Sequence, residues 1–450
     1  MKFNDYFNLR DVTINVTNTC NLRCPYCFED NKNKLKMSKE TIEKVLDKCY
    51  QNYLKSNDGR YPFVVNFFGG EPFLNFDVIE YGMKYAQEKR YNMTFGVTTN
   101  LTILTDHMID VIEEYDLGLL ISIDGIREIH NRNRCNSYDT VKANVKKLTD
   151  RHLHHLMEVR MTVMPEDVDY LLTSIQSIVD MGIVNIAPVA VTDTHWTSEQ
   201  YVKFEENLCK VWDWLIDIYN NNDNKDNVSI KFIEDYLEKV LTLPLVESQN
   251  KVCMAGTKHS CSIGVGGDIL PCHQRHSVRD GYEKLLMGNI LLDPEIRDIT
   301  FNEQTIQGAF DCNQCIANGI CKGGCPSENY TQNGNGNIMN ETQCMITSIM
   351  VGVACEYQQK IMECTNIRSR RLNILAENLK LLKMLFEEVL IHEPCTKSYV
   401  NALMMFYEKL IDMEDILLPT FNEAFQTVVE QMVNINKEIM SLIEDNHNEC

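Results

Sequence analysis

This sequence has no long apolar run and comparatively little basic charge. No stretch of about 18 apolar residues occurs, so no membrane span is expected. Residues 1–10 are polar and lack the apolar core of a secretory signal, so we expect a cytoplasmic protein. Lys and Arg number 43 against 64 Asp and Glu, and the formal net charge is -21. That balance argues against direct binding to nucleic acid or to an anionic membrane surface.

Internal repeats and low-complexity tracts are also absent, whereas cysteine is abundant, with 18 in 450 residues. Thiols of a cytoplasmic protein are kept reduced, which argues against a disulfide framework. So many thiols in a reducing compartment indicate metal binding, and their spacing should show which metal is bound.

Residues 11–189 alternate between strand-like and helix-like patterns. The strands are expected at 11–17, 63–68, 93–98, 118–123, 158–163 and 184–189. Six strands separated by helices predict an α/β fold with a parallel sheet and right-handed crossovers. An open sheet and a partial barrel both fit this pattern, and in either the functional site lies at the carboxyl ends of the strands.

A cysteine-rich loop follows the first predicted strand and reads Cys20-Asn-Leu-Arg-Cys24-Pro-Tyr-Cys27. Three thiolates on one short loop can hold three corners of a four-iron cluster and leave the fourth iron open to a small molecule. Structural zinc normally takes four protein ligands, so the alternative is half of a zinc site that is completed elsewhere in the chain.

Polar residues stand where the next predicted strands end. The run Gly69-Gly70-Glu71-Pro72 ends the second strand; its glycines allow close backbone approach to a ligand, and Glu71 can pair with an ammonium group. The other candidates are Asn100 after the third strand, Ser122 and Asp124 after the fourth, and Arg160 on the fifth. Each alone could be strand-end capping, but their order along one sheet indicates a common site.

Residues 10–190 thus resemble the radical S-adenosylmethionine superfamily, whose signature is three cysteines at this spacing with an aromatic residue, here Tyr26, before the third. The resemblance implies a partial (β/α)6 TIM-like barrel. It implies that Cys20, Cys24 and Cys27 hold a [4Fe–4S] cluster whose open iron binds S-adenosylmethionine. The implied cofactor contacts are Tyr26, Gly69, Gly70, Glu71 and Pro72, with Asn100, Ser122, Asp124 and Arg160 at the ribose and carboxylate. Arg134 is a weaker candidate, because charged runs such as residues 130–134 are often solvated.

A second group of cysteines lies in a glycine- and asparagine-rich segment with weak periodicity, which predicts a region that needs a metal to fold. Its thiols suffice for two four-cysteine clusters, or equally for two structural zinc sites. They are Cys253, Cys261, Cys272, Cys312, Cys315, Cys321, Cys325 and Cys344. A hairpin is expected at residues 266–268.

Behind a radical S-adenosylmethionine region, this layout resembles the SPASM domain. The resemblance implies two auxiliary [4Fe–4S] clusters, one on Cys253, Cys261, Cys272 and Cys325 and the other on Cys312, Cys315, Cys321 and Cys344. We expect the barrel at 1–195, a helical linker at 196–250, the auxiliary-cluster domain at 251–350 and a helical C-terminal region at 351–450. That last region carries amphipathic patterns at 372–390, 398–413 and 421–443. Most other cysteines, Cys49 among them, are expected to be small buried residues.

Taken together, the chain resembles maturases of ribosomally made peptides that form thioethers, of the sactipeptide and ranthipeptide type. The resemblance implies reductive cleavage of S-adenosylmethionine to a 5′-deoxyadenosyl radical. That radical would abstract hydrogen from a cysteine-containing precursor peptide to form a thioether crosslink, and an external one-electron donor would feed the cluster. Because the first predicted strand begins at Asp11, the leader-recognition domain often fused before it is expected to be absent.

Three alternatives remain open. The first is formylglycine formation in a sulfatase. In that family an aspartate follows the auxiliary cysteine, whereas His273 stands there in this chain, which disfavours it. The second is a carbon–carbon or carbon–oxygen crosslink. The third is a non-catalytic iron–sulfur or zinc protein.

Overall fold

A computed structural model describes residues 2–29, 32–56, 61–220, 228–242, 253–276, 282–292, 295–299, 307–318, 320–321 and 323–363. The amphipathic patterns predicted at 372–390, 398–413 and 421–443 lie outside these residues. Within the described part of the chain, no helix combines the length and the apolar character that crossing a membrane would require.

All six predicted strands are present, each within one residue of its expected start. They are β1 (Asp11–Thr17), β2 (Phe63–Gly69), β3 (Met93–Thr99), β4 (Gly118–Ser122), β5 (Met157–Val163) and β6 (Asn185–Ala190). They pair in sequence order and every pairing is parallel, which confirms the predicted α/β fold. Because neighbouring strands run the same way, their carboxyl ends meet at one edge of the sheet.

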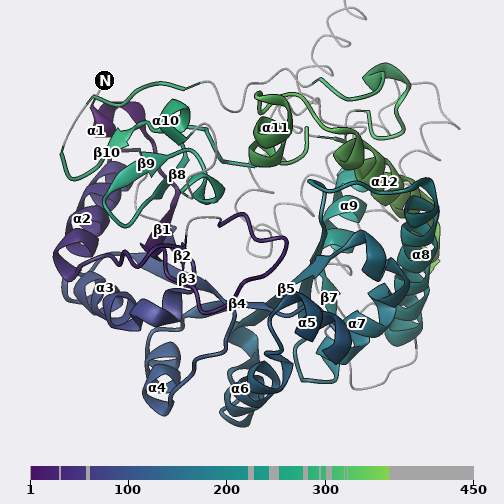
Figure 1. Ribbon diagram of the computed structural model, residues 1–450, viewed down its shortest axis with the longest axis horizontal. Helices are drawn as coiled ribbons and strands as arrows, with labels where there is room; N and C mark the ends of the chain where they lie inside the picture. Colours follow the sequence, from purple (N-terminus) through teal and green to yellow (C-terminus); the bar gives the residue numbers. More distant parts are fainter. Residues whose placement is uncertain are drawn as a thin grey trace, which may run out of the picture.

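Helices cover the outer side of this curved sheet (Figure 1). Those between the strands are α2 (Lys39–Ser56), α3 (Phe76–Glu88), α4 (Asp106–Glu114), α5 (Arg127–Asn133), α6 (Tyr138–Asp150) and α7 (Leu171–Val179). In α3 the buried residues Phe76, Ile79 and Met83 recur every three or four positions, so one face of the helix packs on the sheet. A short α1 (Phe3–Tyr6) precedes β1.

The predicted helical linker contains α8 (Ser198–Asn220) and α9 (Lys231–Thr242), with the two-residue strand β7 (Ser229–Ile230) before α9. Strand β7 pairs with β6 and extends the sheet, a pairing that no periodicity in the sequence predicted. Helix α12 (Glu341–Glu363) packs against α8, where the rings of Trp212 and Tyr357 stack with centroids 5.4 Å apart.

The cysteine-rich segment joins the barrel rather than standing apart from it. Its strand β8 (Ser260–Ile263) pairs in parallel with β1, and β9 (Asp268–Leu270) returns antiparallel to β8 through the predicted hairpin. The short β10 (Gly288–Asn289), α10 (Tyr282–Leu285) and α11 (Pro326–Asn333) complete the described part of this segment. Its fold therefore depends on the barrel's edge.

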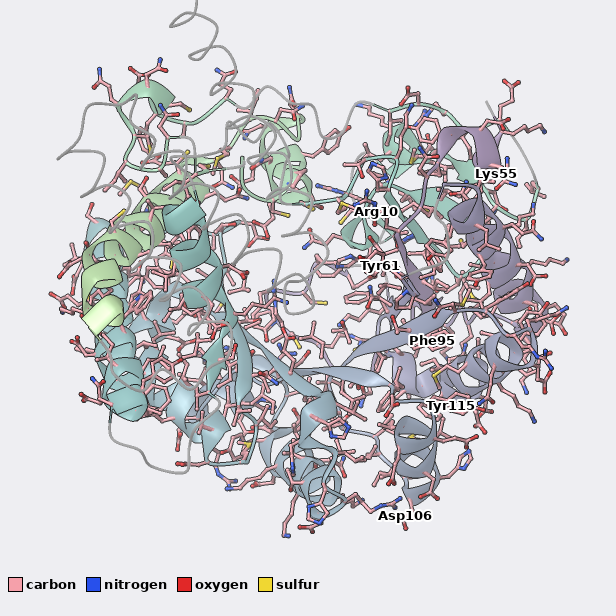
Figure 2. All side chains as sticks on the ribbon, turned by 180° about the vertical axis from the view of Figure 1, so that it is seen from behind. Arg10, Lys55, Tyr61, Phe95, Asp106 and Tyr115 are labelled. Atoms are coloured by element: carbon pink, nitrogen blue, oxygen red, sulfur yellow. The ribbon has the colours of Figure 1, made fainter. Side chains whose placement is uncertain are left out.

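The main hydrophobic core lies between the sheet and the outer helices, and β1 contributes Val12, Ile14 and Val16, each fully buried. Across neighbouring strands, the rings of Phe67 and Phe95 stack with centroids 5.8 Å apart. Figure 2 shows Phe95 in the middle of the molecule, with Asp106 at the start of α4 near one edge. This packing fixes the strand ends that carry the candidate site.

Candidate functional site

A cavity of about 800 Å³ opens at the carboxyl ends of the strands and continues into the barrel. Its walls come from the loop after β1, from strands β1 to β6 with the residues that connect them, from Lys231 of α9 and from the cysteine-rich segment. The structure thus brings together the predicted residues Cys20, Cys24, Cys27, Tyr26, Gly69, Gly70, Glu71, Asn100, Ser122 and Arg160. Pro72 and Asp124 do not line the cavity and are buried beside it.

The three thiols of the first loop all face this cavity. The backbone N–H of Leu22 donates to Cys20 Sγ at 3.4 Å, and Cys24 and Cys27 are close enough for their charges to interact. Burial raises the pKa of Cys24 to about 11, so a bound metal would have to displace its proton. Three thiols on one loop, facing an enclosed space, are a donor set suited to an iron–sulfur cluster with one open iron.

The glycine pair at the end of β2 holds the cysteine loop against the strand. The backbone N–H of Gly70 donates to Thr17 O at 2.8 Å, and that of Glu71 donates to Thr19 O at the same distance. A Cβ atom at Gly69 would lie 2.1 Å from Thr17 O, and one at Gly70 would lie 2.5 Å from Thr19 O. Only glycine allows this approach, which positions the chain just before Cys20.

Glu71 is fully enclosed, and its carboxylate has protein donors. Thr99 Oγ1 donates to it at 2.6 Å and the backbone N–H groups of Asn100 and Phe73 donate at 2.7 and 3.1 Å. Burial raises the pKa of Glu71 despite these donors. Pro72 begins the short 3₁₀-helix Pro72–Asn75, so its position is explained by chain geometry.

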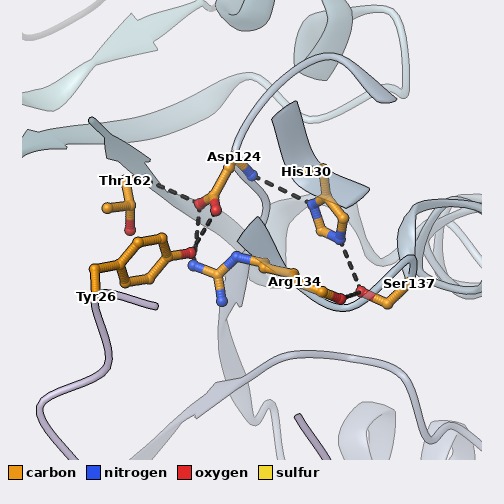
Figure 3. Close-up of polar contacts among 6 residues, drawn as sticks. All are labelled: Tyr26, Asp124, His130, Arg134, Ser137 and Thr162. Atoms are coloured by element: carbon orange, nitrogen blue, oxygen red, sulfur yellow. Dashed lines mark hydrogen bonds and ion pairs between the residues drawn. The ribbon is translucent and has the colours of Figure 1, made fainter. Parts of the chain in front are cut away.

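Asp124 anchors a buried network below the cavity wall (Figure 3). Its carboxylate accepts from Arg134 Nη2 at 3.0 Å, from the backbone N–H of Thr162 at 3.1 Å and from the hydroxyl of Tyr26. The Arg134 guanidinium lies over the Tyr26 ring, 5.4 Å from its centroid. Asp124 therefore fixes the aromatic residue of the cysteine loop to the end of β4.

Arg134 is not solvated, contrary to the expectation for residues 130–134. It is 6% exposed, it lines the cavity, and its Nε has no hydrogen-bond partner within the described residues. Neighbouring His130 is fully buried, and its ring bonds to the Asp124 backbone and to Ser137. The two residues are four apart at the end of α5, a spacing that places them on one helix face and could have identified the buried side.

Arg160 lies on β5, opposite Ser122 of β4. Its side chain is open to the cavity and enclosed by protein elsewhere, and this burial lowers its pKa. The negative charge of Glu328 in α11 attracts the Arg160 guanidinium and partly offsets this lowering of its pKa. The Glu328 carboxylate also accepts hydrogen bonds from Thr192 and from Gln343 Nε2. Glu328 lines the cavity and was missed from the sequence, although Pro326 at a helix start places it in the first turn.

The cysteine-rich segment closes the far wall of the cavity with His273, Gln274, Ser327, Glu328 and Thr331. The His273 ring packs against two aromatic rings, with centroids 4.4 Å from Phe68 and 5.8 Å from Phe28. Phe28 directly follows Cys27, so the wall formed after Cys272 touches the loop that carries the first three thiols.

Four thiols of this segment gather as predicted. The charge of Cys321 interacts with those of Cys344, Cys315 and Cys312. Backbone N–H groups point at the sulfurs: Ala309 N lies 3.3 Å from Cys344 Sγ, and Gly323 N lies 3.4 Å from Cys321 Sγ. Such donors stabilise thiolates, so this donor set suits a four-cysteine cluster.

The other predicted set is only partly assembled. Burial raises the pKa of the Cys325 thiol, and negative charge on Cys272 or Cys253 raises it further. Burial also raises the pKa of the Cys261 thiol, where the added charge comes instead from Cys49 and Asp11, on the barrel side of β8. Among the described residues, no group of three or more His, Cys, Asp or Glu side chains converges as the ligands of a single metal ion would.

Comparison with known proteins places the barrel in a family. The sequence model of the Radical SAM superfamily matches residues 14–178. A protein of unassigned function from Methanocaldococcus jannaschii is 34% identical over 120 residues, which is 26% of this chain and 40% of that protein. The cysteine-type anaerobic sulfatase-maturating enzyme of Clostridium perfringens is 26% identical over 345 residues, which is 68% of this chain and 85% of that enzyme.

A solved structure, native anSMEcpe with bound AdoMet, has a TM-score of 0.62 at 19% identity and covers 82% of this chain and 99% of its own. At this identity the likeness shows a shared fold. The matching fold, the cysteine loop on the cavity and the match over residues 14–178 agree with one another. Residues 14–178 therefore match the Radical SAM superfamily, and the chain shares the fold of a solved structure with bound AdoMet.

Proposed function

We propose that this enzyme matures a peptide by radical oxidation and that its product is a thioether crosslink. The observation that carries the proposal is the shared cavity, where Cys20, Cys24 and Cys27 face a wall built next to two auxiliary cysteines. A side chain placed in this space would lie between the radical source and a region able to hold an electron acceptor.

When bound, the cluster and S-adenosylmethionine supply a 5′-deoxyadenosyl radical that removes a hydrogen atom from an unreactive carbon. Glu71, with the backbone of Gly69 and Gly70, would hold the amino group of S-adenosylmethionine. Asn100, Ser122 and Arg160 would contact its ribose and carboxylate, since all three line the same cavity. Asp124 would act through Tyr26 and Arg134, because both bond to its carboxylate.

A peptide substrate is supported by the named relatives. They include the sulfatase-maturating enzyme and, at a TM-score of 0.51, SuiB of Streptococcus suis bound to its precursor peptide SuiA. Thioether formation is favoured over formylglycine formation by His273, which occupies the place of the aspartate expected in sulfatase maturases. The His273 ring is packed against Phe28 and Phe68, so the environment of this position is aromatic.

Formylglycine formation is the second candidate. The match to the sulfatase-maturating enzyme covers 85% of that enzyme, which favours this alternative. Both reactions would need the same cluster and cavity, so they can be distinguished only by identifying the chemical group formed in the product.

Mass spectrometry after anaerobic co-expression with a small cysteine-containing peptide encoded beside the enzyme would test the proposal. A thioether product has lost two hydrogens per link, and its cysteines resist alkylation. A formylglycine product instead reacts with an aldehyde-specific hydrazide. Peptides of unchanged mass, with a Cys24→Ala variant as the inactive control, would contradict both functions.

A further inference from the structure

The side chain of Glu328 is not needed to cap its own helix. Glu328 is the third residue of α11, and a glutamate at that position commonly accepts a hydrogen bond from the backbone N–H of the N-cap residue. Here the N-cap is Cys325, and its N–H donates instead to Gln343 Oε1 at 3.0 Å. The Glu328 carboxylate is therefore left to line the cavity.

This carboxylate is held through only one of its two oxygens. Thr192 Oγ1 and Gln343 Nε2 both donate to Oε2 of Glu328, the latter at 2.9 Å. Among the described residues, no group donates to Oε1. Two donors on one oxygen fix the orientation of the group, so the other oxygen is a preorganised acceptor for a ligand in the cavity.

Asp193 and Arg160 are the charged neighbours of Glu328 on this wall, and both line the cavity. Burial raises the pKa of Glu328, the charge of Asp193 raises it further, and that of Arg160 lowers it. Within the part of the chain that the structure describes, Arg160 forms an ion pair with neither carboxylate. Two carboxylates thus share one guanidinium, and this part of the wall has an excess of negative charge.

Elsewhere on the cavity wall, charges occur in pairs. Glu158 lies 3.6 Å from Lys231 Nζ near the amino ends of the strands, and Arg134 is paired with the buried Asp124. The wall around Glu328 is therefore where a ligand cation would find carboxylate oxygens that are not already paired with a protein cation.

From this placement we infer that Glu328, with Asp193 beside it, binds a positively charged lysine or arginine side chain of the peptide. The cation would donate to Oε1 of Glu328 in a charge-assisted hydrogen bond and would offset the excess negative charge. The net charge of -21 favours the approach of a basic partner to this chain. The inference rests on the proposed function in one respect, namely that the substrate is a peptide.

Two small probes of equal length test the inference on the reconstituted protein. N-acetyllysine methylamide carries the ammonium group, and N-acetylnorleucine methylamide has the same carbon chain without it. Saturation-transfer NMR gives the dissociation constant of each probe. We expect the lysine probe to bind about tenfold more tightly, as one hydrogen bond to a charged group allows. Equal affinity for the two probes would overturn the inference.

Glu328→Gln keeps the size of the side chain and removes its charge, so we expect the preference for the lysine probe to disappear. Glu158→Gln is the matched control, because it removes a cavity-lining carboxylate that already has Lys231 as its partner. An equal loss of lysine-probe binding in both variants would indicate a general charge effect and would overturn the inference. Asp193→Asn changes no helix residue and should also weaken binding of the lysine probe.

Adding S-adenosylmethionine separates this subsite from the cofactor's contacts. We expect the lysine probe to remain bound at saturating S-adenosylmethionine, and its displacement would overturn the inference. Probe binding requires no peptide product, so a bound lysine probe together with an unmodified precursor would count against the proposed function alone. A precursor modified equally well by the wild type and by Glu328→Gln would count against the inference alone.

Discussion

At the scale of single residues, the buried pair of Asp124 and Arg134 links the cysteine loop to the barrel. Asp124 is 1% exposed and accepts from Arg134, Thr162 and Tyr26. Arg134→Ala would leave this carboxylate without its cation, and we expect a loss of about 3 kcal/mol in the free energy of unfolding. Chemical denaturation of the wild type and the variant measures this difference in the free energy of unfolding. Arg127→Ala, which removes an exposed ion pair with Asp139, is the control and should have a much smaller effect.

His130 makes stability depend on pH. The Asp124 N–H donates to His130 Nδ1, and Ser137 Oγ donates to Arg134 O, so His130 Nε2–H donates to Ser137 and the ring is neutral. Burial lowers its pKa from 6.5 to about 4. The unfolded chain then binds the extra proton between these values, so stability should fall by up to roughly 3 kcal/mol as the pH drops from 6.5 to about 4.

Denaturation curves recorded across this range check that prediction. A His130→Gln variant should show a flatter dependence on pH, because glutamine keeps a donor and an acceptor but does not titrate. A pH dependence as steep as in the wild type would show that other groups control acid stability.

Prediction from sequence succeeded for residues whose position follows from a strand end and was weaker for those set by packing. Asn100 and Ser122 were placed by the strand pattern, and both line the cavity. Arg134 was ranked low because a charged run is usually solvated. In the structure it is buried because its guanidinium pairs with Asp124, ten residues earlier in the chain. Composition cannot reveal such a pairing, since it depends on how α5 packs under β4.

At the scale of elements, the end of β2 positions the loop that carries the first three cysteines. Gly70→Ala would bring a Cβ to 2.5 Å from Thr19 O and push that loop away. We expect the variant to lose about four of its roughly twelve irons after reconstitution, because one cluster site is displaced.

Gly266→Ala is the matched control, because a Cβ there meets no atom within 4 Å. Iron and sulfide content of the two variants, prepared side by side, gives the comparison. Full iron content in Gly70→Ala would show that the loop tolerates the displacement.

The six main strands were predictable because each shows apolar residues bounded by helical patterns. Strand β7 was not, because two residues carry no periodicity and its pairing with β6 is a tertiary event. The pairing of β8 with β1 could not be predicted from the sequence either, although the glycines at residues 266 and 267 indicated the hairpin of β8 and β9. Long-range pairing between distant segments leaves little trace in a single sequence.

At the scale of the whole molecule, the barrel and the cysteine-rich segment should differ in how much they depend on iron. The barrel has a continuous core, whereas the described residues of the segment at 307–325 share only a small apolar cluster of Ala317 and Ile320 with Val351 of α12. Hydrogen exchange of Cys321→Ala should show lost protection at 307–325 and unchanged protection in β2 to β5. Cys209→Ala, whose thiol lies outside both cysteine sets, is the control. Loss of protection throughout the barrel would show that the two parts unfold together.

Cysteine spacing leaves open the direction in which each thiol points. Cys312, Cys315, Cys321 and Cys344 are near one another in the structure, as the short spacings indicated. Cys261 was assigned to the first auxiliary set by the resemblance to the SPASM domain, and the register of β8 on β1 places its side chain in the main core. The direction of one side chain along a strand is set by pairing, which spacing does not encode.

The central claim is that Cys20, Cys24 and Cys27 hold a cluster that cleaves S-adenosylmethionine. The most direct test is to quantify 5′-deoxyadenosine after adding dithionite and S-adenosylmethionine to the reconstituted protein. We predict its formation by the wild type and its absence in a Cys24→Ala variant that retains about eight irons. A wild-type protein with about twelve irons that forms no 5′-deoxyadenosine would contradict the account.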